Sequence, residues 1–129
     1  MIYVDSSIAL VHLLVEDHRP PPAFWAESLI ASRLLEYEVC CPLHARTLAA
    51  SHGAGARELL VRVSMVELSP LVLARALEPF PVPLRTLDAL HLASIEFLRG
   101  CRLRPRLASY DERMQRAARA MGIDLLEPG

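Results

Sequence analysis

Short apolar runs alternate along this chain with longer segments whose apolar residues recur at helical spacing. Residues 2–4 are three consecutive β-forming residues, a run that favours a strand buried on both faces. Asp5 and two serines follow, and these residue types are favoured at helix N-caps. The apolar segment 8–15 then predicts a helix. Asp5 therefore stands where a buried strand passes into a helix.

The remaining pattern predicts further strands and helices in alternation. Strands are expected over residues 31–35, 65–68, 106–109 and 123–126. Helices are expected over residues 22–30, 36–50, 56–63, 71–78, 86–98 and 110–122. Polar, proline-rich or glycine-rich connections are expected at 16–22, 51–55 and 79–83. Pro42 should kink or restart the helix that contains it.

Strands that alternate with helices predict a parallel sheet with helices on both of its faces. The length of 129 residues suits one domain over residues 1–129. No apolar run approaches the ~20 residues of a membrane span, and no signal peptide is evident. The cysteines Cys40, Cys41 and Cys101 are odd in number and two are adjacent, which argues against a disulfide framework. We expect buried thiols in a cytoplasmic protein.

The basic residues narrow the choice of function. The net charge is only −1, so no global basic field indicates nucleic-acid binding. All 14 basic residues are arginine, and the chain has no lysine. Aspartyl-phosphate enzymes also place an aspartate after the first strand, but they need a lysine beside the phosphoryl group. The absence of lysine therefore argues against this class of enzyme. A P-loop is excluded because the chain has no G-K-[ST] motif.

Acidic residues recur at predicted helix starts. Asp5 and Asp111 stand at two such starts, Thr86 is a plausible N-cap that places Asp88 in a first turn, and Glu38 lies early in another helix. The helix dipole alone would explain each acid as a cap. Two of these acids directly follow predicted strands, so they share one edge of the sheet. Ligands bind at that edge in open α/β sheets.

Carboxylates that converge at this edge need a cation. Two of them ~4 Å apart repel by about 4 kcal/mol at an effective dielectric constant near 20. A cluster of three or four takes up protons unless cations neutralise it. In a chain without lysine the neutralising group is arginine or a metal, and all-oxygen ligands suit Mg²⁺ or Mn²⁺. Such a site performs metal-assisted phosphodiester hydrolysis.

Four motifs carry a resemblance to a known family. They are YVDSS at 3–7, SRL at 32–34 leading to Glu38, LDALHLA at 87–93, and SYDER at 109–113. With these motifs the chain resembles the PIN-domain ribonucleases, and among them the VapC-type toxins of bacterial toxin–antitoxin pairs. The resemblance implies a PIN-like three-layer α/β/α sandwich with a short, mostly parallel central sheet.

The resemblance also implies a site and its partners. The catalytic and metal-binding pocket falls on four acids of this chain: Asp5, Glu38, Asp88 and Asp111. Glu36 is an alternative to Glu38, although the spacing from Ser32 favours Glu38. The implied activity is that of a Mg²⁺-dependent endoribonuclease, with Mn²⁺ as a substitute. The implied partners are an RNA substrate, a cognate VapB-like antitoxin that neutralises the enzyme, and a second copy in a homodimer.

Other side chains near these acids have two interpretations. Ser6 either orients a metal-bound water or caps its helix, and His91 either serves the site or packs in the core. Three arginines either hold RNA phosphates or lie in a solvated loop: Arg102, Arg104 and Arg106. The first two helices, with Trp25, are expected to offer the antitoxin a groove.

A degenerate PIN domain that binds RNA or protein without cleaving it is the alternative function. Four like charges in one place argue against it, because a binding module gains nothing from their repulsion. Saturable Mn²⁺ binding that Asp5→Asn abolishes would separate the two functions.

Overall fold

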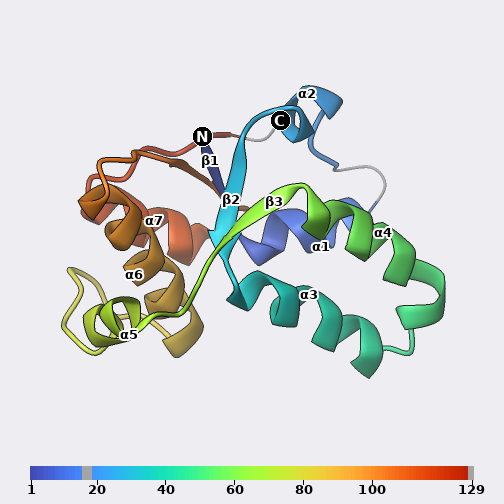
Figure 1. The fold of residues 1–129 in the computed structure, drawn as a ribbon, viewed down its shortest axis with the longest axis horizontal. Coiled ribbons are helices and arrows are strands. Elements are labelled where there is room, and N and C mark those ends of the chain that lie inside the picture. Colours follow the sequence, from blue (N-terminus) through green and yellow to red (C-terminus); the bar gives the residue numbers. More distant parts are fainter. Residues whose placement is uncertain (16–18, 128–129) are drawn as a thin grey trace.

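The centre of the molecule is a sheet of four short parallel strands in the order β3-β2-β1-β4 (Figure 1). The computed structural model describes residues 1–15 and 19–127. The strands are β1 (Ile2–Val4), β2 (Leu29–Ser32), β3 (Val63–Val66) and β4 (Arg106–Ala108). The predicted parallel sheet is confirmed.

Helices cover both faces of this sheet, as Figure 1 shows. One layer consists of α1 (Ser6–Leu14), α3 (Leu34–Ala45) and α4 (Ala49–Val61), with the short α2 (Pro22–Trp25) beside it. The other layer consists of α6 (Thr86–Gly100) and α7 (Glu112–Ala120), with α5 (Pro70–Ala76) packed on α6. The three-layer α/β/α sandwich is therefore confirmed.

Strand β1 joins the two halves of the hydrophobic core. Ile2 and Val4 pack with the layer that contains α1, α3 and α4, whereas Tyr3 packs with the layer of α6 and α7. All three side chains are fully buried. Successive residues of a strand point to opposite faces, so a strand covered on both sides must be apolar at every position.

Strand β2 begins earlier than the sequence pattern predicts. The expected helix over 22–30 ends at Trp25 as α2, and the strand expected over 31–35 spans Leu29–Ser32. Leu29 pairs with Ile2 of β1, so pairing with the central strand overrides the helical spacing of the apolar residues. Helix α3 then begins at Leu34, two residues before the predicted start.

The predicted break at 51–55 is wrong, because α4 runs through it from Ala49 to Val61. The chain turns instead just before α4, at Thr47, whose φ is +56°. A Cβ at Gly55 would lie 3.4 Å from the Leu13 side chain of α1. The two helices therefore lie in contact at Gly55, although glycine costs about 1 kcal/mol relative to alanine inside a helix. Helix α3 also continues through Pro42 without restarting.

Smaller predictions differ at the ends of elements. The strand expected over 123–126 is only an isolated bridge between Leu107 and Leu125, and Thr86 is the first residue of α6 rather than its N-cap. The thiols were predicted to be buried, but Cys41 and Cys101 are exposed. The connection predicted over 16–22 includes residues 16–18, which lie outside the described residues. No helix in the described ranges has the length and apolar character needed to cross a membrane.

Candidate functional site

The candidate site lies at the carboxyl ends of β1 and β4. Successive strands run outward from β1 through β2 to β3, and β4 then returns to the other side of β1. The strand order reverses between β1 and β4, and ligands of open α/β sheets bind at such a reversal. Asp5 directly follows β1 and Ser109 directly follows β4, so the fold brings residues 104 positions apart into contact.

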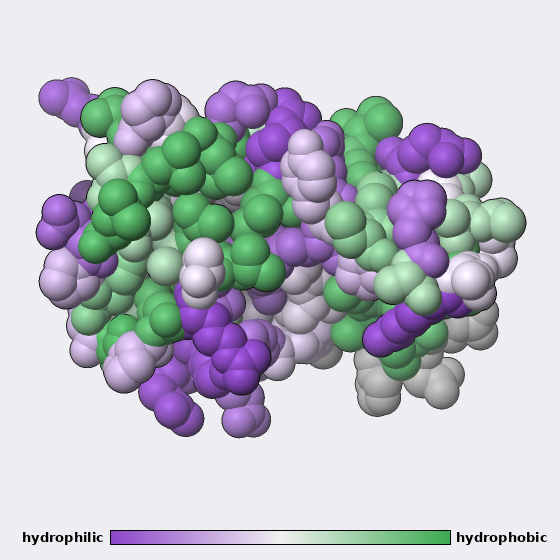
Figure 2. All heavy atoms as spheres, turned by 90° about the horizontal axis from the view of Figure 1, so that it is seen from below, coloured by the Kyte–Doolittle hydropathy of each residue, from purple (hydrophilic) through white to green (hydrophobic). Residues whose placement is uncertain are grey.

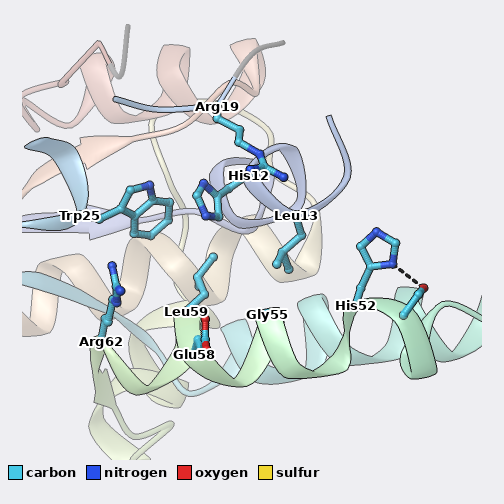
Figure 3. Close-up of a pocket in the computed structure, with 10 residues that line it drawn as sticks. His12, Leu13, Arg19, Trp25, His52, Gly55, Glu58, Leu59 and Arg62 are labelled. Carbon is cyan, nitrogen blue, oxygen red and sulfur yellow. Dashed lines mark hydrogen bonds between the residues drawn. The ribbon is translucent and has the colours of Figure 1, made fainter. Parts of the chain in front are cut away.

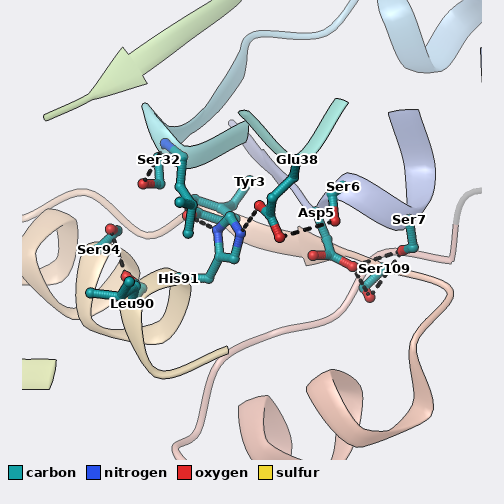
Figure 4. Close-up of polar contacts among 11 residues, drawn as sticks. Tyr3, Asp5, Ser6, Ser7, Ser32, Glu38, Leu90, His91, Ser94 and Ser109 are labelled. Atoms are coloured by element: carbon teal, nitrogen blue, oxygen red, sulfur yellow. Dashed lines mark hydrogen bonds and ion pairs between the residues drawn. The ribbon is translucent and has the colours of Figure 1, made fainter. Parts of the chain in front are cut away.

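Asp5 is held from two sides and does not cap its helix (Figure 4). Its Oδ2 accepts hydrogen bonds of 2.7 Å from both Ser7 Oγ and Ser109 Oγ, and the residue is 5% exposed. These hydroxyls in turn accept bonds from the backbone N–H groups of Tyr110 (2.9 Å) and Asp111 (3.0 Å). The cap interpretation of Asp5 is therefore wrong, since its carboxylate joins the ends of two strands.

Ser7 and Ser109 belong to two of the motifs, but the sequence assigned neither of them a role at the acids. Their signal is positional, because each lies two residues from an acid at a strand end: Ser7 from Asp5 and Ser109 from Asp111. A serine hydroxyl both donates and accepts, so it can bind a carboxylate and a backbone amide together.

Asp88 and Asp111 face the same region from α6 and α7. Asp88 lies in the first turn of α6, as predicted. Asp111 is the N-cap of α7 and accepts a hydrogen bond of 2.9 Å from the backbone N–H of Arg113. Partial burial raises the pKa of Asp88, and the negative charges of Asp111 and Asp5 raise it further. The three aspartates are therefore close enough to repel one another.

Glu38 completes the group of acids from α3. Its Oε1 accepts a hydrogen bond from His91 Nε2, and its Oε2 lies 3.4 Å from Ser6 Oγ (Figure 4). Glu36 instead forms a 2.8 Å ion pair with Arg33. Glu38 thus lies beside His91 and Ser6, whereas Glu36 pairs with Arg33. Ser6 contacts Glu38, and its side chain forms no cap bond to α1.

The electrostatic surroundings of His91 link it to the acids. Burial lowers the pKa of its imidazole, but the hydrogen bond that it donates to Glu38 and the charges of Glu38, Asp5 and Asp88 outweigh this effect, so the pKa is raised. The four acids and His91 therefore form one electrostatic unit, and the region where the four carboxylates face one another is called the acid crevice below.

The donor chemistry of this unit fits a hard divalent cation, although the acids are not tightly assembled. Carboxylate oxygens prefer Mg²⁺ or Mn²⁺, and the pKa of Asp88 is raised by burial and by the charges of Asp111 and Asp5, although Arg113 and His91 partly offset this effect. Across residues 1–15 and 19–127, no group of three or more His, Cys, Asp or Glu side chains is spaced to hold a metal ion. The side chains of Asp88 and Asp111 are both partly exposed.

The three arginines considered for phosphate binding lie at the opposite edge of the sheet. Arg106 pairs with Ile2 where the strands begin, and Arg102 and Arg104 precede it in the loop. They do not line the acid crevice. Arg113 does lie beside it, with Nε 4.0 Å from Asp111 Oδ1, and its side chain is half exposed.

A separate cavity of about 280 Å³ lies between α1, α2 and α4, away from the acids (Figure 3). Trp25 and His12 form one wall, with ring centroids 4.6 Å apart. Arg19 and Arg62 lie beside them, and burial together with these two positive charges lowers the pKa of His12. This cavity is basic and aromatic, so it is chemically unlike the acid crevice.

Together, the fold and the crevice define an α/β protein with acids gathered at the switch point of a parallel sheet, an arrangement suited to cation-assisted hydrolysis. The comparisons with known proteins agree. Residues 2–120 match the PIN domain family, and the chain belongs to that family.

Its relatives include two ribonucleases of Mycobacterium tuberculosis. Ribonuclease VapC46 is 39% identical over 133 residues, which cover 98% of this chain and 97% of that protein. Ribonuclease VapC35 is 27% identical over 135 residues, which cover 100% of this chain and 98% of that protein. No solved structure is a significant match. The resemblance to VapC-type PIN ribonucleases is thus confirmed over nearly the whole chain.

Proposed function

We propose that this protein is an endoribonuclease toxin that hydrolyses RNA phosphodiester bonds at the acid crevice with Mg²⁺, for which Mn²⁺ can substitute. The observation that carries the proposal is the placement of Asp5. It is a nearly buried carboxylate that two serines hold at the switch point of the sheet, within electrostatic reach of Asp88. The two relatives named as VapC ribonucleases support the same activity.

The four acids have graded roles in this proposal. Asp5 and Asp88 hold the cation directly, because each comes from the rigid start of a helix. Glu38 and Asp111 complete the pocket through waters or through a second cation. The bound cation supplies an activated water and stabilises the leaving oxygen. Arg113 at the rim holds an RNA phosphate and so orients the scissile bond.

The test compares Asp5→Asn with Asp124→Asn, an exposed aspartate outside the crevice. Asparagine keeps an oxygen that accepts from Ser7 and Ser109, so the fold should persist. RNA cleavage and Mn²⁺ binding in calorimetry should fall by orders of magnitude in Asp5→Asn and stay unchanged in Asp124→Asn. EDTA should abolish cleavage by the wild-type protein. Cleavage that survives EDTA would refute the cation mechanism.

The alternative, a degenerate PIN domain that only binds RNA or protein, gives a different result. Its wild-type form would show no saturable Mn²⁺ site, and Asp5→Asn would leave RNA binding intact. If the variants of the acids lose activity only to the extent that they lose thermal stability, the acids stabilise the fold and do not take part in catalysis.

We further propose that a VapB-like antitoxin neutralises the protein by binding the cavity between α1, α2 and α4. A positively charged side chain of the antitoxin, such as an arginine, enters the acid crevice at the same time. The basic edge at Arg19 and Arg62 suits an acidic residue beside an apolar segment. Arg62→Glu should weaken the complex, whereas Arg57→Glu, on the same helix but outside the cavity lining, should not. Full nuclease activity in the purified complex would contradict the proposal.

A homodimer is proposed through α5. Leu71 and Leu77 are 71% and 88% exposed, and Figure 2 shows hydrophobic residues gathered on this side of the molecule. Contiguous exposed apolar residues mark interaction surfaces in soluble proteins. Light scattering at micromolar concentration should give the mass of a dimer, and the mass of a monomer would contradict the proposal.

A further inference from the structure

A line of three hydrogen-bonded side chains connects the core to Glu38 (Figure 4). His91 Nε2 donates to Glu38 Oε1, and His91 Nδ1 shares a 2.7 Å hydrogen bond with the Tyr3 hydroxyl. The backbone N–H of Ser32 donates to that hydroxyl at 3.1 Å. The line therefore begins on the backbone of β2, passes through β1 and α6, and ends on a carboxylate of the crevice.

Burial of Tyr3 and His91 fixes the orientation of the side chains in this hydrogen-bonded line. Tyr3 is 0% exposed and His91 is 1% exposed. The two rings meet edge to face, with centroids 5.8 Å apart and an interplanar angle of 83°. A carboxylate can only accept hydrogen bonds, so Nε2 carries a proton and points it at Glu38. The core thus determines where the Nε2–H bond points.

We infer that His91 is a positioning residue, which holds the Glu38 carboxylate in its working orientation before a cation or RNA arrives. This inference rests on the proposed function, because it assigns Glu38 to the cation pocket. His91 retains Oε1, so Glu38 presents Oε2, the oxygen beside Ser6, to the crevice. Glu38 would accordingly have only Oε2 free to serve a bound cation, because Oε1 is held by His91.

A carboxylate that is oriented before the cation arrives should bind that cation with higher affinity. A glutamate side chain has three rotatable bonds, and ordering it at the moment of cation binding weakens affinity. Partners that orient a ligating residue typically contribute 10–100-fold in metal affinity. A histidine that only packs in the core would not contribute, because any side chain of similar volume would serve.

Two substitutions at position 91 separate positioning from packing. The amide of His91→Gln reaches the place of Nε2 and can donate to Glu38. The shorter amide of His91→Asn reaches the place of Nδ1, so it keeps a partner for Tyr3. It cannot donate a hydrogen bond to Glu38. Both variants are polar and uncharged, and each keeps one of the two hydrogen bonds of His91: His91→Gln keeps the bond to Glu38, and His91→Asn keeps the bond to Tyr3.

The first measurement is Mn²⁺ binding by calorimetry. His91→Asn should lower the affinity by about 10-fold or more, whereas His91→Gln should stay within about 3-fold of the wild type. In the Glu38→Gln background, His91→Asn should cause no further loss, because there is no carboxylate left to position. Equal losses in the two variants, or losses that follow their unfolding temperatures, would overturn the inference.

The second measurement needs no metal. A double-mutant cycle between position 91 and Glu38→Gln, read by urea unfolding, should give a coupling for His91→Asn that His91→Gln lacks. Absence of that coupling would overturn positioning even in an active enzyme. If the wild-type protein binds no Mn²⁺, the proposed function fails, but this cycle still decides whether His91 holds Glu38.

Discussion

Removing the Ser109 hydroxyl should destabilise the protein more than any ordinary surface substitution. Ser109 Oγ donates to Asp5 Oδ2 at 2.7 Å and accepts from the Asp111 backbone N–H at 3.0 Å. The residue is 2% exposed, so water cannot readily replace these bonds. Ser109→Ala therefore takes one hydrogen bond from a carboxylate and leaves one amide without its partner.

The magnitude follows from these two losses. A hydrogen bond to a charged group contributes about 1.5–3 kcal/mol, and an unsatisfied buried amide costs about 1–3 kcal/mol. Partial compensation leaves about 2–4 kcal/mol for Ser109→Ala. In a domain of this size 1 kcal/mol shifts the melting temperature by roughly 4 °C, so we expect a fall of roughly 8–16 °C.

The assay is thermal and urea unfolding of Ser109→Ala beside Ser64→Ala, a matched change at an exposed position of β3. Ser64→Ala should shift the melting temperature by no more than about 2 °C. Mn²⁺ affinity should fall about 10-fold in Ser109→Ala, because Asp5 loses a support. A melting temperature equal to that of Ser64→Ala would refute the view that Asp5 and Ser109 tie the two strand ends together.

Three further predictions concern the acids and the exposed face. Asp88→Asn should raise the stability of the metal-free protein at neutral pH. The folded-state pKa of Asp88 is raised, so its ionisation costs stability as the pH rises through the unfolded value near 3.9, and the gain in urea unfolding should vanish below that pH. Asp111→Ala should cost about 1 kcal/mol in urea unfolding through the lost cap bond to Arg113, whereas Asp111→Asn should cost less than half as much. Leu77→Glu should give a monomer in light scattering with unchanged unfolding, because Leu77 is 88% exposed.

The sequence was most informative where local signals agree with the fold. Residues 2–4 are β-forming and apolar at every position, which suits the centre of a parallel sheet, and β1 lies there. The sequence was least informative where packing decides. Gly53 and Gly55 resemble a break, yet α4 includes both, and this helix packs into the core through Ala56 and Leu59.

The site could be predicted as a set of acids but not as a network. The positions of Asp5, Asp88 and Asp111 followed from the expected ends of strands and starts of helices. Contacts such as that of Asp5 with Ser109, or Tyr3 with His91, join residues 104 and 88 positions apart. Periodicity carries no information about such pairs, since strand order and register determine them.

The place of β1 in the sheet has a consequence for synthesis of the protein. Residues 2–4 are synthesised long before residues 106–108, so β1 must wait for β4 before its second edge is paired. Asp5 likewise waits for Ser109. Of the four acids, Asp5 and Glu38 are therefore synthesised well before the chain can bring all four together, because that arrangement needs β4 and the residues that follow it.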